Sequence, residues 1–168
     1  MPRRAPSRSV DVFVEIPRGS RAKYELDRAT GRIRLDRVLF ASVHYPADYG
    51  FVTDTTAGDG DPLDALVVVE EPTFPGCIVP ARPIGTLLMR DENGKDEKIL
   101  AVPVGDPRFD QVRALDDLAP HWLREIEMFF ATYKALEGGK VALAGWRGPA
   151  EAWALIERSR VPAAKARR

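Results

Sequence analysis

Residues 59–64 constrain this chain more than any other stretch. They read D-G-D-P-L-D, so the carboxylates of Asp59, Asp61 and Asp64 fall within six residues. Carboxylates crowded in this way repel one another and raise each other's pKa unless cations lie between them. Hard divalent ions such as Mg²⁺ prefer oxygen ligands and relieve this repulsion. Because the apolar run 65–69 follows at once, the segment predicts a rigid metal-binding turn at the end of a sheet.

Strand-like patterns dominate the chain before this turn and continue after it. Valines alternate with other residues over 10–16, which places Glu15 on the face opposite the valines. Similar patterns predict strands over 22–27, 32–36, 50–53, 65–69, 78–82, 85–89 and 99–104. The turn dipeptide Thr30-Gly31 joins the strands predicted over 22–27 and 32–36 in a hairpin.

The hydrophobic period then changes from that of strands to that of helices. Leu123, Ile126, Phe130 and Tyr133 recur at helical spacing, which predicts a helix of about four turns. We expect Asp116 or Asp117 to cap its start and the glycine pair 138–139 to end it. A second helix is expected to begin at Pro149 and to carry Trp153 and Ile156. Short strands followed by helices predict a mainly β, α+β fold with a small barrel.

Composition limits the functions that the chain can have. Its 25 basic and 25 acidic residues cancel, so no overall field favours nucleic acid or an anionic membrane. The 168 residues suit one domain, 1–168, with tails at 1–9 and 161–168 that we expect to be flexible. The single cysteine, Cys77, excludes an intrachain disulfide and is expected to be a buried, inert thiol. No apolar run is long enough for a membrane span, and the polar N-terminal segment does not resemble a secretory signal.

Several other polar segments carry weaker signals. Asp91 and Asp96 flank the hairpin-turn dipeptide Asn93-Gly94, which taken alone favours a solvated turn. The spacing still allows both acids to converge on one ion, which becomes suggestive only beside the acidic segment 59–64. His44 and His121 have no cysteine at a zinc spacing and are expected to be structural or exposed. The sequence contains no Walker-type phosphate loop, no nucleophile elbow and no zinc-protease helix.

Taken in order, these motifs resemble the soluble family I inorganic pyrophosphatases, in their short bacterial form. The resemblance runs from about residue 12 to Lys134 and includes V-E-I-P at 14–17, K-Y-E at 23–25, L-D-R at 35–37 and Y-P-A-D-Y-G at 45–50. It continues through D-G-D-P-L-D at 59–64, the turn 91–98 and F-F-A-T-Y-K at 129–134. It implies a five-stranded OB-like barrel with flanking C-terminal helices, a cytoplasmic location and a homohexamer.

The resemblance also implies a role for each matching residue. Metal ions would be held by Glu15, Asp59, Asp64, Asp91 and Asp96. The phosphoryl groups would be bound by Lys23, Arg37, Tyr49, Lys98, Tyr133 and Lys134, with Glu25 and Tyr45 in support. Asp61 would accept the proton of the attacking water, although Asp96 is a second candidate, because coupled carboxylates titrate as a group.

The implied reaction is Mg²⁺-dependent hydrolysis of pyrophosphate, bound as its Mg complex, by direct attack of an activated water. Mn²⁺ or Zn²⁺ are possible substitutes for Mg²⁺. Two other functions stay open at the level of sequence. An OB-like barrel can bind single-stranded nucleic acid, although the neutral charge and the acidic turn argue against this. Another Mg²⁺-dependent phosphohydrolase, acting on nucleotides, would use a similar set of acids. An inactive metal-binding relative is disfavoured by the completeness of the set.

Overall fold

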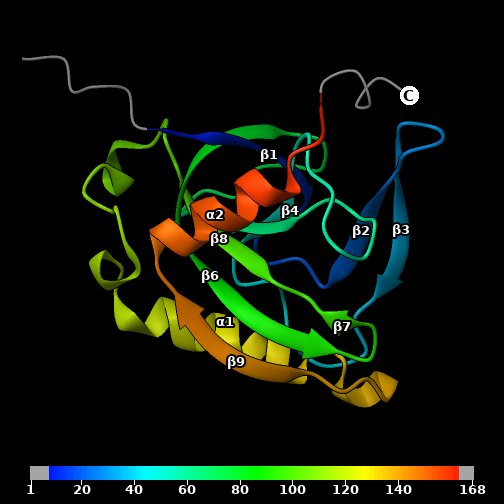
Figure 1. The fold of residues 1–168 in the computed structure, drawn as a ribbon. Helices are drawn as coiled ribbons and strands as arrows, with labels where there is room; N and C mark the ends of the chain where they lie inside the picture. Colours follow the sequence, from blue (N-terminus) through cyan, green and yellow to red (C-terminus); the bar gives the residue numbers. More distant parts are fainter. Residues whose placement is uncertain (1–7, 163–168) are drawn as a thin grey trace, which may run out of the picture.

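The computed structural model describes residues 8–162, so the expected flexible tails lie largely outside the described residues. A sheet that closes on itself forms the centre of the fold (Figure 1). Its five strands pair in the ring β1-β4-β5-β8-β6 and back to β1, all antiparallel except β5 with β8. The ring confirms the predicted small, mainly β barrel. Its strands are β1 (Val10–Ile16), β4 (Asp48–Val52), β5 (Asp64–Val67), β6 (Ile78–Asp91) and β8 (Lys98–Pro103).

The long strand β6 corresponds to two strands that the sequence predicted separately, over 78–82 and 85–89. The pairing of β6 with β8 shifts register between Pro83 and Gly85, which explains the break in the sequence pattern. Gly85 is required here, because a Cβ would lie 2.6 Å from the Leu115 side chain and 2.7 Å from the Arg147 carbonyl oxygen. The end of β6 turns into the two-residue strand β7 (Gly94–Lys95), as the Asn93-Gly94 signal predicted.

A further strand, β9 (Ala142–Arg147), pairs with β6 and was not predicted. Its burial does not alternate cleanly, and Gly145 interrupts it with a positive φ of 88°. The strand is therefore stabilised by its position beside β6 rather than by a pattern of its own.

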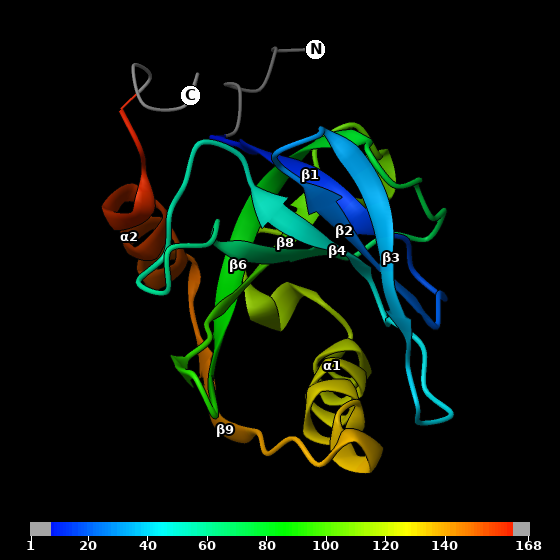
Figure 2. The same cartoon turned by 90° about the vertical axis from the view of Figure 1, so that its right-hand side faces the viewer.

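The predicted hairpin forms a separate two-stranded sheet beside the ring. It consists of β2 (Ala22–Asp27) and β3 (Arg32–Val38). Lys23 pairs with Arg37 across the two strands. Figure 2 shows this hairpin and the C-terminal helix on opposite sides of the ring.

Two α-helices cover different sides of the ring (Figure 2): α1 (Pro120–Thr132) and α2 (Pro149–Ser159). The start of α2 at Pro149 was predicted correctly. The predicted acidic cap of α1 was wrong, because the Asp117 carboxylate accepts hydrogen bonds from the Arg113 and Ala114 N–H groups instead. The predicted end was also wrong, since α1 stops at Thr132 and Gly138 ends a short 3₁₀ turn, η3 (Ala135–Glu137).

Two hydrophobic clusters hold the helices to the strands. One contains Ile126, Phe129 and Phe130 of α1, and the other contains Leu155 and Ile156 of α2 together with the β1 valines. Cys77 is only partly buried, against the second cluster, so the expected full burial was wrong. No helix of residues 8–162 is long and apolar enough to cross a membrane. These clusters leave the polar face of β1 and the start of β5 open toward the β2–β3 hairpin.

Candidate active site

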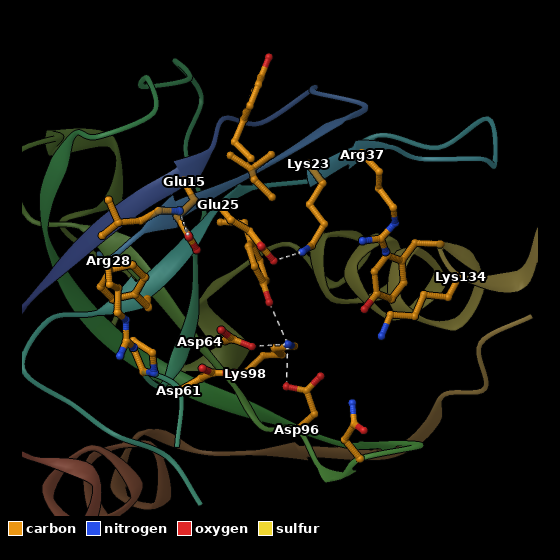
Figure 3. Close-up of a pocket in the computed structure, with 18 residues that line it drawn as sticks. Glu15, Lys23, Glu25, Arg28, Arg37, Asp61, Asp64, Asp96, Lys98 and Lys134 are labelled. Atoms are coloured by element: carbon orange, nitrogen blue, oxygen red, sulfur yellow. Dashed lines mark hydrogen bonds and ion pairs between the residues drawn. The ribbon is translucent and has the colours of Figure 1, made fainter. Parts of the chain in front are cut away.

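A cavity of about 430 Å³ opens between the β2–β3 hairpin, the strand ends of the ring and the end of α1 (Figure 3). Most of the predicted site residues line it: Glu15, Lys23, Glu25, Arg37, Tyr49, Asp61, Asp64, Asp96, Lys98, Tyr133 and Lys134. Asp61, Asp64 and Asp96 gather around Lys98 on one side, the acidic side (Figure 3). Lys23, Arg37 and Lys134 gather on the other, the basic side, where Glu25 lies next to Lys23. Elements far apart in the chain therefore build one charged cavity.

Three predicted residues do not line this cavity. Asp59 lines a neighbouring cavity, which Asp64 and Asp96 also border. Asp91 lies behind Lys134, with its carboxylate 3.8 Å from the Lys134 ammonium. Tyr45 is buried behind Tyr49, with their ring centroids 5.4 Å apart. These positions are adjacent to the cavity rather than on its surface.

The acidic turn has a defined backbone geometry and leads directly into a strand. Gly60 has a positive φ of 88°, which side chains disfavour, and the Asp61 N–H donates to the Asp59 carboxylate at 3.0 Å. The buried Leu63 anchors the turn, since its N–H donates to the Thr55 hydroxyl at 3.0 Å. The strand β5 then begins at Asp64. The turn holds Asp61 at the surface of the cavity while Asp64 lies deeper.

Lys98 lies at the centre of the acidic side. Its ammonium donates to Asp64 at 2.6 Å, to Asp96 at 2.7 Å and to the Tyr49 hydroxyl at 2.8 Å. Burial by itself lowers the pKa of Lys98, but the two carboxylates outweigh that effect and the pKa lies above its ordinary value. Burial raises the pKa of Asp96 above its ordinary value and raises that of the Tyr49 hydroxyl strongly. Lys98 is therefore charged at neutral pH and neutralises much of the acidic side.

A network of alternating charges forms the opposite side. The Lys23 ammonium lies 2.5 Å from Glu25 and 3.1 Å from Asp36, and Arg37 contacts the same Asp36 oxygen at 2.5 Å. The structure thus brings Glu25 to Lys23, as the shared strand face predicted. Asp36 was missed as a site residue, although its place beside Arg37 in the L-D-R motif was a visible signal.

An arginine and an asparagine also line the cavity and were not predicted. Arg28 reaches it from the β2–β3 turn, and Asn93 from the turn between β6 and β7. Neither stands in a sequence pattern that distinguishes it from an ordinary turn residue. Only the approach of the two turns reveals them.

Glu15 extends from β1 into the cavity. Its carboxylate accepts a hydrogen bond from the Leu26 N–H at 2.7 Å, which connects β1 to β2. Burial raises the pKa of Glu15 to about 7, an effect that the hydrogen bond opposes and the nearby Asp64 charge reinforces. Glu15 therefore changes its ionisation close to neutral pH in the metal-free protein.

Comparison with known proteins identifies this arrangement. The family model described as inorganic pyrophosphatase matches residues 12–162. The chain belongs to this family. The inorganic pyrophosphatase of Streptomyces coelicolor is 56% identical over 150 residues, which cover 89% of this chain and 92% of that protein. The inorganic pyrophosphatase of Nostoc sp. is 51% identical, with 89% of each chain covered.

Solved structures of pyrophosphatases share the fold. The inorganic pyrophosphatase of Thermus thermophilus superposes with a TM-score of 0.89 at 42% identity, over 98% of this chain and 94% of that one. The Helicobacter pylori enzyme gives a TM-score of 0.88 at 43% identity, over 90% and 91%. The predicted OB-like fold and the predicted family are therefore both confirmed.

The donor set suits a hard divalent cation, as expected for a metal-dependent pyrophosphatase family. Asp64 and Asp96 direct oxygens at one positive centre, now the Lys98 ammonium, and Asp59 and Asp61 flank them. Between residues 8 and 162, no three histidine, cysteine or acidic side chains are placed to hold one ion as they stand. To bind an ion, the carboxylates of Asp64 and Asp96 would turn from the Lys98 ammonium toward it.

The charges that line the cavity are balanced. Its five acids are Glu15, Glu25, Asp61, Asp64 and Asp96, and its five bases are Lys23, Arg28, Arg37, Lys98 and Lys134. A compact polyanion is attracted to the basic side but repelled by the acidic side, unless cations cover the acids. The arrangement therefore suits an anion that arrives together with divalent cations.

Proposed function

We propose that this protein hydrolyses inorganic pyrophosphate to two orthophosphates in a Mg²⁺-dependent reaction. One observation supports the proposal most directly, which is that an acidic side with oxygen ligands faces a basic side across a single cavity. Membership of the inorganic pyrophosphatase family indicates that the substrate bound between the two sides is pyrophosphate. A phosphoryl transfer needs mainly positioning and charge stabilisation, and this cavity supplies both.

The basic side and the base of the cavity would hold the substrate. Arg37 presents a planar guanidinium suited to two oxygens of one phosphoryl group, whereas lysines act as point charges. The proposed phosphate-binding residues are Lys23, Arg37, Tyr49, Lys98, Tyr133 and Lys134. Lys98 is connected to Tyr49 by a 2.8 Å hydrogen bond, so the two would bind one phosphoryl group together.

The acidic side would hold the metal. The proposed ligands are Glu15, Asp59, Asp64, Asp91 and Asp96. When bound there, Mg²⁺ would lower the pKa of the attacking water and neutralise charge on the phosphate oxygens. Mn²⁺ or Zn²⁺ could take its place. Asp64 and Asp96 border both cavities beside the acidic turn, so each could act as a ligand to a metal ion in either cavity.

Asp61 would accept the proton. It lines the cavity at the exposed end of the acidic turn, where a water molecule can reach it. The water oxygen forms a bond to one phosphorus atom as the bond from that phosphorus to the bridging oxygen breaks. The water proton passes to Asp61, and the bridging oxygen leaves with the second orthophosphate. Asp96 is the second candidate acceptor, because burial, reinforced by the Asp64 and Asp91 charges, raises its pKa, and coupled carboxylates titrate as a group.

The wider expectations from the sequence stay part of this proposal: one domain spanning 1–168, a cytoplasmic location, no nucleic-acid or membrane partner, and a homohexamer. For assembly, a hollow between α1 and the loop 42–46 is lined by His44, His121 and Met128, with 64% of Met128 exposed. The partly exposed Trp122 lies beside it in sequence. Light scattering should show a hexamer, and a stable monomer at micromolar concentration would contradict assembly.

The experiment is orthophosphate release from pyrophosphate by the full chain, with Mg²⁺ and with excess EDTA. Fast Mg²⁺-dependent release that falls by orders of magnitude in Asp61→Asn supports the proposal. Asp116→Asn, at an exposed position outside the cavity, is the matched control and should keep wild-type activity. No release with Mg²⁺, Mn²⁺ or Zn²⁺ would overturn the proposal. Faster release from ATP than from pyrophosphate would favour a nucleotide phosphohydrolase instead.

A further inference from the structure

Glu137 contacts Arg37 at the edge of the cavity although the two lie far apart in the sequence. The Glu137 Oε1 atom is 2.5 Å from the Arg37 Nε atom. Only 15% of the Glu137 side chain and 25% of the Arg37 side chain is exposed. The ion pair connects η3, just after α1, to β3 of the hairpin.

Arg37 is the one partner that explains the burial of this carboxylate. The second oxygen, Oε2, is buried and accepts no hydrogen bond within the described part of the chain. A buried carboxylate is costly unless it is paired. Within residues 8–162, the ion pair with Arg37 is therefore the contact that compensates the burial of the Glu137 carboxylate.

The same turn fixes a second base. The Glu137 and Gly139 N–H groups both donate to the Lys134 carbonyl oxygen, at 3.0 and 3.2 Å. Gly139 packs closely on the Lys134 stem, since a Cβ on Gly139 would lie 2.9 Å from the Lys134 Cβ. The turn thus holds Glu137 toward Arg37 while it presents Lys134 to the cavity.

The guanidinium of Arg37 is held at two of its nitrogen atoms. Glu137 forms an ion pair at Nε, whose N–H makes no hydrogen bond within residues 8–162, and Asp36 accepts a hydrogen bond from Nη1. Two contacts fix the plane of a rigid guanidinium, whereas Asp36 alone leaves it free to rotate about a single contact. A fixed plane matters for two-point binding of phosphate oxygens.

We propose that Glu137 is a positioning residue that holds the Arg37 guanidinium in the orientation that binds a phosphoryl group. This role rests on the proposed pyrophosphatase function. Glu137 itself does not line the cavity, so it acts through Arg37. Its loss would weaken substrate binding more than it would slow the chemical step.

The test is a double-mutant cycle with Glu137→Gln, Arg37→Gln and the double variant, read as KM and kcat for pyrophosphate with saturating Mg²⁺. We expect Glu137→Gln to raise KM about tenfold and to change kcat less, since it removes a contact that orients a substrate ligand. In the Arg37→Gln background it should have almost no further effect, because residues that act as a unit are non-additive. Glu137→Asp keeps the charge and should fall between the wild type and Glu137→Gln.

Glu151→Gln is the matched control, because Glu151 also pairs with an arginine Nε, that of Arg147 at 3.7 Å, and lines none of the cavities described above. It should leave KM unchanged. An unchanged KM in Glu137→Gln, or equal effects with and without Arg37, would overturn the positioning role. If Glu137→Gln does not fold, the same cycle with Glu137→Asp decides. A wild-type protein that does not hydrolyse pyrophosphate would instead refute the proposed function.

Discussion

The Lys98 ammonium lies 2.6 Å from the Asp64 carboxylate, with only 3% of the Lys98 side chain exposed. Asp96 holds the same ammonium from the other side at 2.7 Å. A buried cation between two acids supplies the charge that the acidic turn requires when no metal is bound. The lysine and the metal ions therefore compete for the same oxygens, so stability and metal binding are coupled at this point.

Lys98→Met should destabilise the metal-free protein, because it leaves Asp64 and Asp96 partly buried without a cation. We expect a loss of about 2–3 kcal/mol, or roughly 5–10 °C in Tm, measured in EDTA. Added Mg²⁺ should raise the Tm of the variant more than that of the wild type, since the carboxylates are then free to turn to the ion. Hydrolysis should fall with the loss of a phosphate ligand. Lys140→Met, at an exposed position, should behave as wild type, and an equal Mg²⁺ response in all three proteins would contradict the coupling.

Glu15→Gln should change how the stability of the metal-free protein depends on pH. Burial raises the pKa of Glu15 from 4.5 to about 7, so the folded form binds a proton that the unfolded form releases. The stability of the wild type should therefore fall as pH rises from 4.5 through 7, by about 1–2 kcal/mol after allowance for solvent access. The glutamine variant lacks this loss. The Tm of the variant minus that of the wild type, both measured in EDTA, should be several degrees larger at pH 8 than at pH 5.

The control for this pH profile is Glu92→Gln, which changes an exposed acid on the β6–β7 turn. Its Tm difference from wild type should stay constant from pH 5 to pH 8. A Glu15→Gln profile parallel to that of wild type would show that Glu15 titrates normally in the folded protein.

Local patterns in the sequence predicted the acidic half of the site. The turn 59–64 and the strand alternation at Glu15 each depend on neighbouring residues alone, and the structure places both as expected. Asp36 contacts Lys23 across the β2–β3 hairpin, and Glu137 contacts Arg37 from η3. Both contacts join separate elements, so the roles of Asp36 and Glu137 escaped prediction. Contacts between separate elements leave no periodic pattern in the sequence.

Two errors in the secondary structure have the same physical origin, which is that tertiary or local contacts override a pattern. Asp117 has the residue type of a helix cap, but its carboxylate accepts two backbone bonds from the preceding turn. Strand β9 has weak alternation, but it is held by its pairing with β6. In both cases hydrogen bonds to a neighbouring segment determined the structure, and the local sequence pattern did not.

Asp48→Ala should lower stability strongly, because Asp48 is fully buried and accepts three hydrogen bonds. They come from the Arg18 N–H at 2.8 Å and from the N–H and hydroxyl of Thr73 at 3.1 and 2.5 Å. Their removal leaves buried donors without an acceptor, which should cost about 3 kcal/mol, or roughly 6–12 °C in Tm. The exposed Asp11→Ala is the control in a melting experiment. A variant that melts with the wild type would show that water replaces the carboxylate.

Gly50→Ala should disrupt the contact between β4 and β1 on which the cavity depends. A Cβ at Gly50 would lie 1.8 Å from the Phe13 carbonyl oxygen, so the two backbones must separate. Tyr49 precedes Gly50 on β4 and Glu15 follows soon after Phe13 on β1, so separation moves two cavity residues at once. We expect a loss of at least about 3 kcal/mol and a fall in kcat/KM of about tenfold or more. Gly105→Ala, where a Cβ meets no atom within 4 Å, should leave Tm and kcat/KM unchanged. If Gly50→Ala matches that control in both measurements, the close approach of β1 and β4 is not what fixes the cavity.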